Sequence, residues 1–104
     1  MNKTYKLEYL PTFYDDLEKV VDYIAIRLEN PQAAATLIDE VESAIQQRIF
    51  DPEGYEPYDL VRKHKYSYYR IYVKNYTIFY VLIDNVMEVR RFIYSRRDLT
   101  RFIR

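Results

Sequence analysis

The stretch YRIYVKNYTIFYVLIDNVMEVRRFIY, residues 69–94, predicts three consecutive β-strands. Aromatic and β-branched residues dominate its three runs, 69–73, 76–83 and 86–94, as is typical of strands. Lys74-Asn75 and Asp84-Asn85 separate the runs, and Asn and Asp tolerate the positive φ of two-residue hairpin loops. The middle run is apolar on both faces, as expected for a central strand that is covered on both sides. The stretch therefore predicts an antiparallel meander.

Counting back from the two loops places Arg70 opposite Phe79, and Phe79 opposite Arg90. Directly opposed side chains of antiparallel strands lie on one face of the sheet. This face is expected to be exposed, basic and aromatic, with Tyr72, Arg70, Phe79, Arg90, Phe92 and Tyr94. The other face is expected to pack on helices, with Ile71, Val73, Ile78, Tyr80, Met87, Val89 and Ile93. Arg91 falls on the helix side, so either it pairs with a helix carboxylate such as Asp22 or a β-bulge shifts the strand.

The first half of the chain predicts a strand and two helices. Residues 5–9, Tyr-Lys-Leu-Glu-Tyr, alternate between apolar and charged side chains, which indicates a strand. Apolar residues then recur every three or four positions, first as Phe13, Leu17, Val20, Ile24 and Leu28. A second such stripe comprises Ala34, Leu37, Val41, Ile45 and Ile49. Between the two stripes, Pro31 disfavours helical geometry at Asn30, and Asn30 can cap the second helix. Residues 11–50 therefore predict a helical hairpin.

These elements predict one α+β domain over residues 1–104. An N-terminal strand and a two-helix hairpin would pack on an antiparallel sheet that contains the three-stranded C-terminal meander. A short C-terminal helix is expected from about Asp98 to Ile103. The length of 104 residues is that of one small domain.

The composition excludes several classes of protein. The chain has no Cys and a single His, so disulfides, cysteine chemistry and a zinc site built from its own side chains are not expected. No run of about 18 apolar residues is present to span a membrane, and the N-terminus does not resemble a signal peptide. We expect a soluble, cytoplasmic protein with no metal, no cofactor and no membrane partner.

The net charge of zero conceals a strong asymmetry. Residues 1–59 contain five Lys/Arg and 13 Asp/Glu, whereas residues 60–104 contain 11 Lys/Arg and three Asp/Glu. This division indicates either a basic functional surface or acidic helices that neutralise a basic sheet. Arginines beside aromatic rings suit nucleic acid, because guanidinium groups neutralise phosphates and rings stack on unpaired bases. The alternatives are a solvated sheet face with cation–π pairs, and a surface that binds an acidic protein helix.

Several segments, in this order, resemble the RelE/ParE superfamily of toxins. They are residues 5–9, NPQAA at 30–34, YRI at 69–71 with NYTIFY at 75–80, and RFIYSRRD at 91–98. The resemblance covers almost the whole chain and implies the toxin of a bacterial type II toxin–antitoxin system. RelE-like members cut mRNA in the ribosomal A site, and ParE-like members poison DNA gyrase without being enzymes. The implied partners are an acidic antitoxin that folds on binding and either the ribosome with mRNA or DNA gyrase.

The resemblance to RelE-like nucleases also implies site residues. Arg70 stands where those nucleases contact the scissile phosphate. The catalytic set that the resemblance implies is Arg70, Arg97, Lys65 and Lys63. For substrate binding we expect Arg96, from the same resemblance, and Arg90, Phe79 and Tyr94, from the basic and aromatic face of the sheet. Phe102, however, stands where those nucleases have a Tyr or His, and a phenyl ring cannot transfer a proton. Tyr94 or His64 could substitute. An mRNA endoribonuclease, a gyrase inhibitor and a non-toxic basic binding module therefore all stay open.

Overall fold

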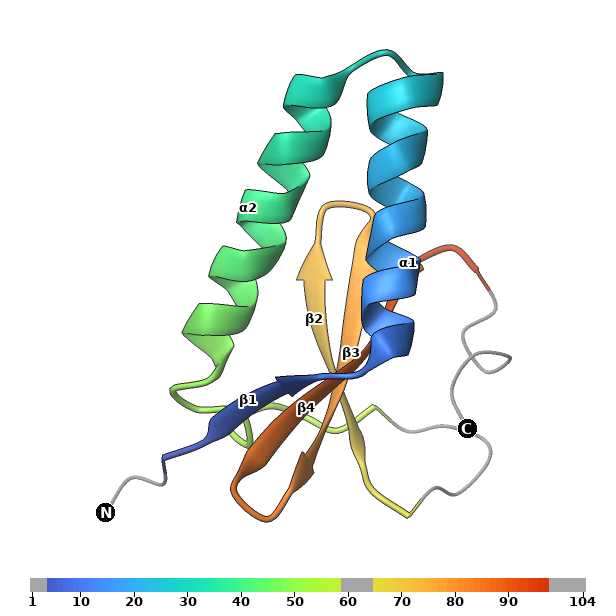
Figure 1. Cartoon of the computed structure of the whole chain (residues 1–104). Helices are drawn as coiled ribbons and strands as arrows, with labels where there is room; N and C mark the ends of the chain where they lie inside the picture. Colours follow the sequence, from blue (N-terminus) through green and yellow to red (C-terminus); the bar gives the residue numbers. More distant parts are fainter. Residues whose placement is uncertain (1–3, 59–64, 98–104) are drawn as a thin grey trace.

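The computed structural model describes residues 4–58 and 65–97, and these form a four-stranded sheet with two helices on one face (Figure 1). The first half contains β1 (Lys6–Tyr9), α1 (Pro11–Asp22), a π-helical turn (Tyr23–Arg27) and α2 (Pro31–Arg48). The second half contains β2 (Tyr68–Val73), β3 (Tyr76–Ile83) and β4 (Val86–Tyr94). The predicted α+β order of strand, helical hairpin and meander is confirmed. The predicted C-terminal helix lies outside the described residues.

The sheet has the strand order β1-β4-β3-β2, and it is mixed rather than antiparallel. β1 pairs with β4 in parallel, with Lys6 opposite Val86, whereas the other two pairings are antiparallel. The prediction of an antiparallel sheet is therefore wrong at β1. The cause is the connection through the helical hairpin. It returns the chain to the end of the sheet at which β1 begins, so β2 runs in the same direction as β1. The two tight turns that follow leave β4 with that direction too.

The boundary between the helices has the predicted cap. The side chain of Asn30 accepts a hydrogen bond from the Ala33 backbone N–H at 3.0 Å. Glu29, just before it, has a positive φ of 51°. Leu28, the last residue of the first predicted apolar stripe, is 56% exposed. The buried stripe therefore ends before its predicted end. A π-helical turn has more residues per turn than an α-helix, and it therefore rotates Leu28 away from the core.

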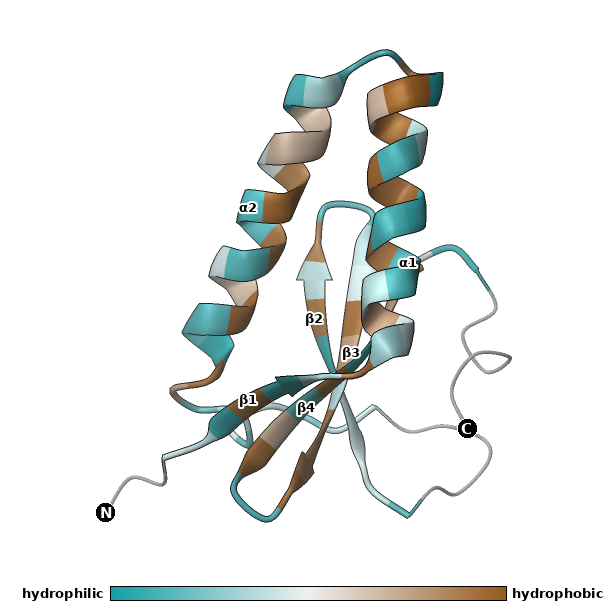
Figure 2. Ribbon diagram, viewed as in Figure 1, coloured by the Kyte–Doolittle hydropathy of each residue, from teal (hydrophilic) through white to brown (hydrophobic). Residues whose placement is uncertain are grey.

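The main core lies between the helices and the sheet. Phe13, Leu37, Val41 and Ile45 of the helices meet a buried face of the sheet. That face comprises Ile71, Val73, Ile78, Tyr80, Met87, Val89 and Phe92. Figure 2 shows that the hydrophobic residues of the two helices lie mainly on their inner sides and the hydrophilic residues on their outer sides. None of the described helices is long and apolar enough to cross a membrane.

A β-bulge in β4 changes the predicted register. Arg70 lies opposite Phe79 as predicted, but Phe79 lies opposite Arg91 and not Arg90. The pairing shifts between Phe79 and Tyr80, so Arg90 is the extra residue on β4. The faces beyond it are exchanged relative to the prediction: Phe92 lies in the core beneath the helices, and Ile93 lies on the opposite face.

Helix α1 holds the bulge in place. Asp16 accepts hydrogen bonds from Arg91 Nε at 2.7 Å, from Arg91 Nη2 at 3.0 Å and from the Phe92 backbone N–H at 3.0 Å. The Thr12 hydroxyl donates to the Arg90 carbonyl at 2.9 Å. The helix carboxylate that pairs with Arg91 is therefore Asp16, and the prediction of Asp22 is wrong. Both predicted explanations for Arg91, a helix carboxylate and a bulge, apply together.

The outer edge of β2 is partly covered by hydrogen-bond donors from the segment that precedes it. The Tyr58 backbone N–H donates to the Tyr68 carbonyl at 2.6 Å, and Arg48 Nη1 donates to the Arg70 carbonyl at 2.9 Å. The same Arg48 nitrogen donates to the Tyr80 hydroxyl at 3.0 Å, which itself donates to the Pro52 carbonyl at 2.6 Å. These bonds join the end of α2 to the sheet.

Candidate functional site

Arg70 and Arg90 both lie on the sheet face that points away from the helices, but their surroundings differ. The Arg70 guanidinium lies 4.3 Å from the Tyr58 ring centre and 5.6 Å from that of Tyr72. Among the described residues it forms no ion pair. The Tyr72 ring is 62% exposed. Arg70 is therefore a half-buried cation framed by rings and without a carboxylate partner.

Arg90 is held by its neighbours. Its Nε donates to Glu88 Oε1 at 2.7 Å, and its Nη1 donates to the Tyr68 hydroxyl at 3.0 Å. Burial alone would lower the pKa of Arg90, but the hydrogen bonds to Tyr68 and Glu88 outweigh burial and raise it. Arg90 is thus already neutralised by a carboxylate on its own strand, and its charge is less available to a ligand than that of Arg70.

The centre of this outer face is covered, contrary to the sequence-based expectation. Phe79 is 0% exposed and packs against Tyr58 and Tyr68. Val81 and Ile93 beside it are buried as well. The expected exposure of Phe79 is therefore wrong, because Tyr58 and Tyr66 of the segment before β2 pack over this cluster together with Tyr68 of β2. Its role in substrate binding stays a prediction, but a ligand could reach the ring only if those tyrosines moved.

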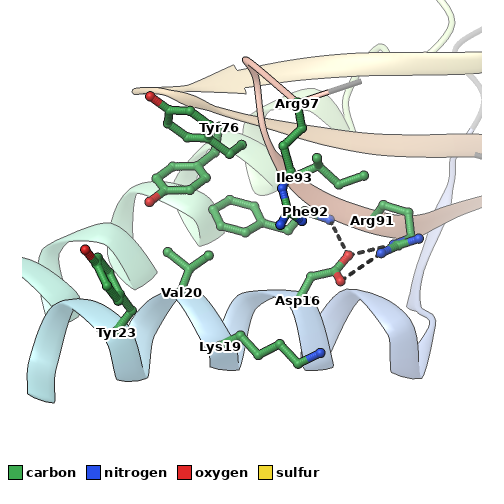
Figure 3. Close-up of a pocket in the computed structure, with 10 residues that line it drawn as sticks. Asp16, Lys19, Val20, Tyr23, Tyr76, Arg91, Phe92, Ile93 and Arg97 are labelled. Carbon is green, nitrogen blue, oxygen red and sulfur yellow. Dashed lines mark hydrogen bonds and ion pairs between the residues drawn. The ribbon is translucent and has the colours of Figure 1, made fainter. Parts of the chain in front are cut away.

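A pocket of about 650 Å³ opens elsewhere, between α1 and the end of β4 (Figure 3). Its lining combines aromatic, aliphatic and charged side chains: Asp16, Lys19, Val20, Tyr23, Tyr76, Arg91, Phe92, Ile93, Tyr94 and Arg97. The Tyr76 ring stacks on Phe92 and meets Tyr94 edge-on, with ring centres 4.8 and 5.8 Å apart. The aromatic side of the pocket is therefore a packed cluster rather than a set of separate side chains.

The charged and phenolic groups of this pocket differ in their partners. The hydrogen bonds with Asp16 raise the pKa of Arg91. They also hold the Asp16–Arg91 ion pair in place at one end of the pocket. Burial raises the pKa of Tyr76, and the nearby phenols of Tyr94 and Tyr23 add to this shift. These three hydroxyls form no hydrogen bond within the described part of the chain, and Lys19 forms no ion pair there. The pocket thus presents unused donors around an apolar floor.

The structure does not bring the predicted site residues into one constellation. Arg97 and Tyr94 line the pocket beside α1, whereas Arg70 and Arg90 lie on the outer face of the sheet. Arg96 is exposed beyond β4, and the Lys65 ammonium lies 5.4 Å from the Tyr66 ring centre. Lys63, His64 and Phe102 lie outside the described residues. No cluster of His, Asp and Glu that could hold a metal ion occurs in residues 4–58 and 65–97.

The helical wall of the pocket was missed by sequence reasoning. Val20 belongs to the apolar stripe of α1 and was assigned to the core. Lys19 and Tyr23 flank that stripe, and nothing in their spacing distinguishes them from ordinary surface residues of a helix. Only the shift of β4 at its bulge, which places Phe92 towards α1, makes this side of the helix part of a pocket.

Comparisons with known proteins give a consistent result. A family model described as "ParE toxin of type II toxin-antitoxin system, parDE" matches residues 7–99. A solved structure of a chromosomal ParDE toxin–antitoxin system from P. aeruginosa is similar, with a TM-score of 0.74 and 8% identity over 89% of this chain and 98% of that one. The RelB–RelE antitoxin–toxin complex from Methanococcus jannaschii has a TM-score of 0.50 and 21% identity over 92% of this chain and 99% of the other. A search of curated proteins found no match.

Proposed function

Because the chain belongs to the ParE toxin family of type II toxin–antitoxin systems, we propose that it inhibits growth by acting on DNA gyrase, and that a cognate antitoxin holds it inactive. The observation that carries this proposal is the match of the ParE family model over residues 7–99. The similar solved structures share the fold and are described as toxin–antitoxin systems or complexes, which supports the existence of an antitoxin partner.

The surroundings of the arginines support a toxin that binds its target rather than one that cleaves RNA. Arg70 lies between rings on the outer face of the sheet, whereas Arg97 lines the pocket beside α1. RNA cleavage through the 2′-hydroxyl needs cations and proton-transfer groups that converge on one phosphate. In the described residues, the groups around Arg70 are phenols, and Glu88 is engaged by Arg90. A surface that inhibits by binding does not need such convergence.

Arg70 is the best candidate for a contact with the target. A guanidinium without a carboxylate partner can form charge-assisted hydrogen bonds to a carboxylate or a phosphate. The rings of Tyr58 and Tyr72 hold it in place and restrict its rotamers. Arg70 would thus meet its partner with less loss of conformational entropy than a free surface arginine.

A supercoiling assay tests the proposal. Purified toxin should prevent gyrase from supercoiling relaxed plasmid and should trap cleaved DNA on the enzyme. A translating extract, with mRNA 5′ ends mapped by primer extension, should show no new ends. New mRNA ends with normal supercoiling would instead establish the nuclease alternative. If expression leaves growth, supercoiling and mRNA unchanged, the chain is a non-toxic binding module.

A further inference from the structure

Of the two edges of the sheet, β1 is the one that the described residues leave open. The N–H groups of Lys6 and Leu10 donate to carbonyls of β4 and of the turn before it, at 2.7 and 2.9 Å. Peptide groups alternate in direction along a strand, so the N–H and C=O groups of Leu7 and Tyr9 point away from β4. In the described part of the chain nothing bonds to them. At the other edge, Arg48 and the Tyr58 N–H already occupy carbonyls of β2.

The side chains of β1 divide between the two faces of the sheet. Leu7 and Tyr9 are half-buried and pack against the main core beneath the helices. Lys6 and Glu8 are exposed and point to the outer face. Among the described residues neither forms an ion pair, and Glu8 lies opposite another carboxylate, that of Glu88 on β4. The open edge thus carries one cation and one anion, two residues apart, on the same face.

The order of these charges selects one way for two copies of β1 to pair. In an antiparallel pair, the outward peptide groups of one strand must meet those of the other. Centring the pair on Leu7 satisfies this condition and places Lys6 of each copy opposite Glu8 of the other. A shift by two residues centres the pair on Lys6 or on Glu8 instead, and like charges then lie opposite each other. Charges on an edge strand usually discourage pairing, but here they discourage the two shifted registers and favour the one between them.

An apolar surface accompanies the open edge on the helix side. Tyr14 and Ile38 are 54% and 37% exposed, and together with Tyr9 they line a small pocket of about 190 Å³. The rings of Tyr9 and Tyr14 pack together, with centres 5.3 Å apart. Opposed side chains of antiparallel strands share a face, so a second copy would bring the same apolar surface to the same side of the sheet. The contact would therefore combine apolar burial with hydrogen bonds between strands.

We propose that β1 is a self-association edge, through which two copies of the chain form an antiparallel β1–β1 pair centred on Leu7. Such a contact is isologous, because the same surface is used by both copies. The four strands of each copy would join in one continuous sheet, with both helical layers on one face and both Arg70 side chains on the other. Because β1 is short, the contact is small and the dimer should dissociate on dilution. The proposal does not depend on gyrase being the target.

Sedimentation velocity of the purified toxin, at concentrations from about 1 to 100 µM, tests the proposal. The weight-average mass should rise with concentration from that of one chain towards that of two. Lys6→Glu and Glu8→Lys should each weaken association by about tenfold or more, because each creates two like-charge pairs across the symmetry axis. Lys19→Glu makes the same charge change on α1, away from β1, and should stay within about threefold of the unchanged toxin.

The double variant makes the experiment independent of folding defects. Combining Lys6→Glu with Glu8→Lys exchanges the two signs and restores opposite charges at both pairs. Association of the double variant should return to within about threefold of that of the unchanged toxin. Two mutations that weakened the dimer only by damaging the fold would not rescue one another.

Amide hydrogen exchange locates the contact on the strand. The N–H groups of Lys6 and Leu10 are bonded within one chain and should exchange slowly at every concentration. Those of Leu7 and Tyr9 point outwards and should become protected only as the concentration rises. This difference between neighbouring amides is specific to a strand added at the β1 edge.

Three results would overturn the inference. The first is the mass of a single chain at every concentration. The second is association that Lys6→Glu and Glu8→Lys leave unchanged, or that the double variant fails to restore, since the contact would then lie elsewhere or in another register. The third is protection of the Leu7 and Tyr9 amides only after the antitoxin is added, which would assign the edge to that partner. The supercoiling assay tests the gyrase proposal separately, so either proposal can fail alone.

Discussion

At the scale of single residues, the three strand arginines show how a carboxylate partner separates a structural role from an available charge. Arg90 is engaged by Glu88, and Arg91 is engaged by Asp16. In the part of the chain that the structure describes, the guanidinium of Arg70 contacts rings and no carboxylate. Two of the three therefore contribute mainly to the position of β4, and Arg70 keeps its capacity to bind.

Replacing Arg70 should affect activity more than folding. Arg70→Ala removes two cation–π contacts, which together cost about 1 to 2 kcal/mol of unfolding free energy. If Arg70 contacts the target, gyrase inhibition should fall by about tenfold or more, because truncating one partner of a charged contact often costs over 1.4 kcal/mol. Urea unfolding and the supercoiling assay measure the two effects. Arg70→Lys is the control that keeps the charge. A variant that unfolds at low urea would show that Arg70 is structural.

The sequence predicted the pairing of Arg70 with Phe79 but not the position of Arg90 in the bulge, for a physical reason. Only one tight turn separates Arg70 from Phe79, so counting from the turn suffices. The bulge lies further along β4, where Arg90 and Arg91 are both charged. The arginine on the helix side indicated a possible bulge, but the apolar pattern could not show which of the two is the extra residue. Asp16 decides between the two registers, and it is distant in sequence.

At the scale of elements, one carboxylate joins α1 to β4. Asp16→Asn should lower the free energy of unfolding by about 1 to 3 kcal/mol, because the amide cannot accept from both the Arg91 fork and the Phe92 N–H. Urea denaturation at neutral pH measures the loss. Asp15→Asn, on an exposed neighbour, should change stability by less than about 0.5 kcal/mol. Equal effects at the two positions would show that helix charge, and not the Arg91 contact, is responsible.

The turn between the helices should be open to improvement. Glu29 has a φ of 51°, which is costly for a residue with a Cβ. Glu29→Gly should raise the unfolding free energy by about 0.5 kcal/mol, since the relief of strain exceeds the added entropy of the unfolded chain. Glu29→Ala removes the same charge but keeps the Cβ, so thermal unfolding should show no such gain. A gain with Ala equal to that with Gly would assign the effect to charge.

Most elements were predictable because their patterns are local. The strands of the meander, the two helices and the Asn30 cap follow from residues within a few positions of one another. The parallel pairing of β1 was not predictable in this way, since it depends on the end of the sheet to which the hairpin returns the chain. The π-helical turn at Tyr23–Arg27 was missed too, because its residues continue the apolar spacing of an α-helix.

At the scale of the whole molecule, the many tyrosines should make stability sensitive to alkali. Burial raises the pKa of Tyr80 to about 12, and it also raises the pKa values of Tyr5, Tyr9 and Tyr76. An unfolded tyrosine ionises near pH 10, so the folded state holds these protons longer. The stabilisation is therefore fully present below about pH 10 and is lost as the pH rises towards 12.

Tyr80 should account for a measurable part of this loss. Its shift corresponds to about 2 to 3 kcal/mol between pH 10 and 12. Urea midpoints for the unchanged toxin should fall over this range, and Tyr80→Phe should show a shallower fall. Tyr80→Phe should also be less stable at pH 8, because the Pro52 carbonyl loses its donor. Parallel slopes for the two proteins would contradict the prediction.

The charge asymmetry of the sequence has two outcomes in the molecule. Part of it is neutralised between layers, as the pairs Asp16–Arg91 and Glu40–Lys74 show. Within residues 4–58 and 65–97, Arg70 on the outer face and Lys19 beside α1 have no carboxylate partner. Composition could predict that positive charge gathers in the sheet. It could not show which cations would be paired, because pairing depends on helix placement and on the bulge.

The donors on the outer edge of β2 bear on how the toxin behaves without its partner. An unpaired edge strand invites a strand from another molecule, and such additions can propagate into fibrils. Here Arg48 and the Tyr58 N–H already occupy the carbonyls of Arg70 and Tyr68. These two bonds leave fewer free acceptors on that edge for a strand from another molecule.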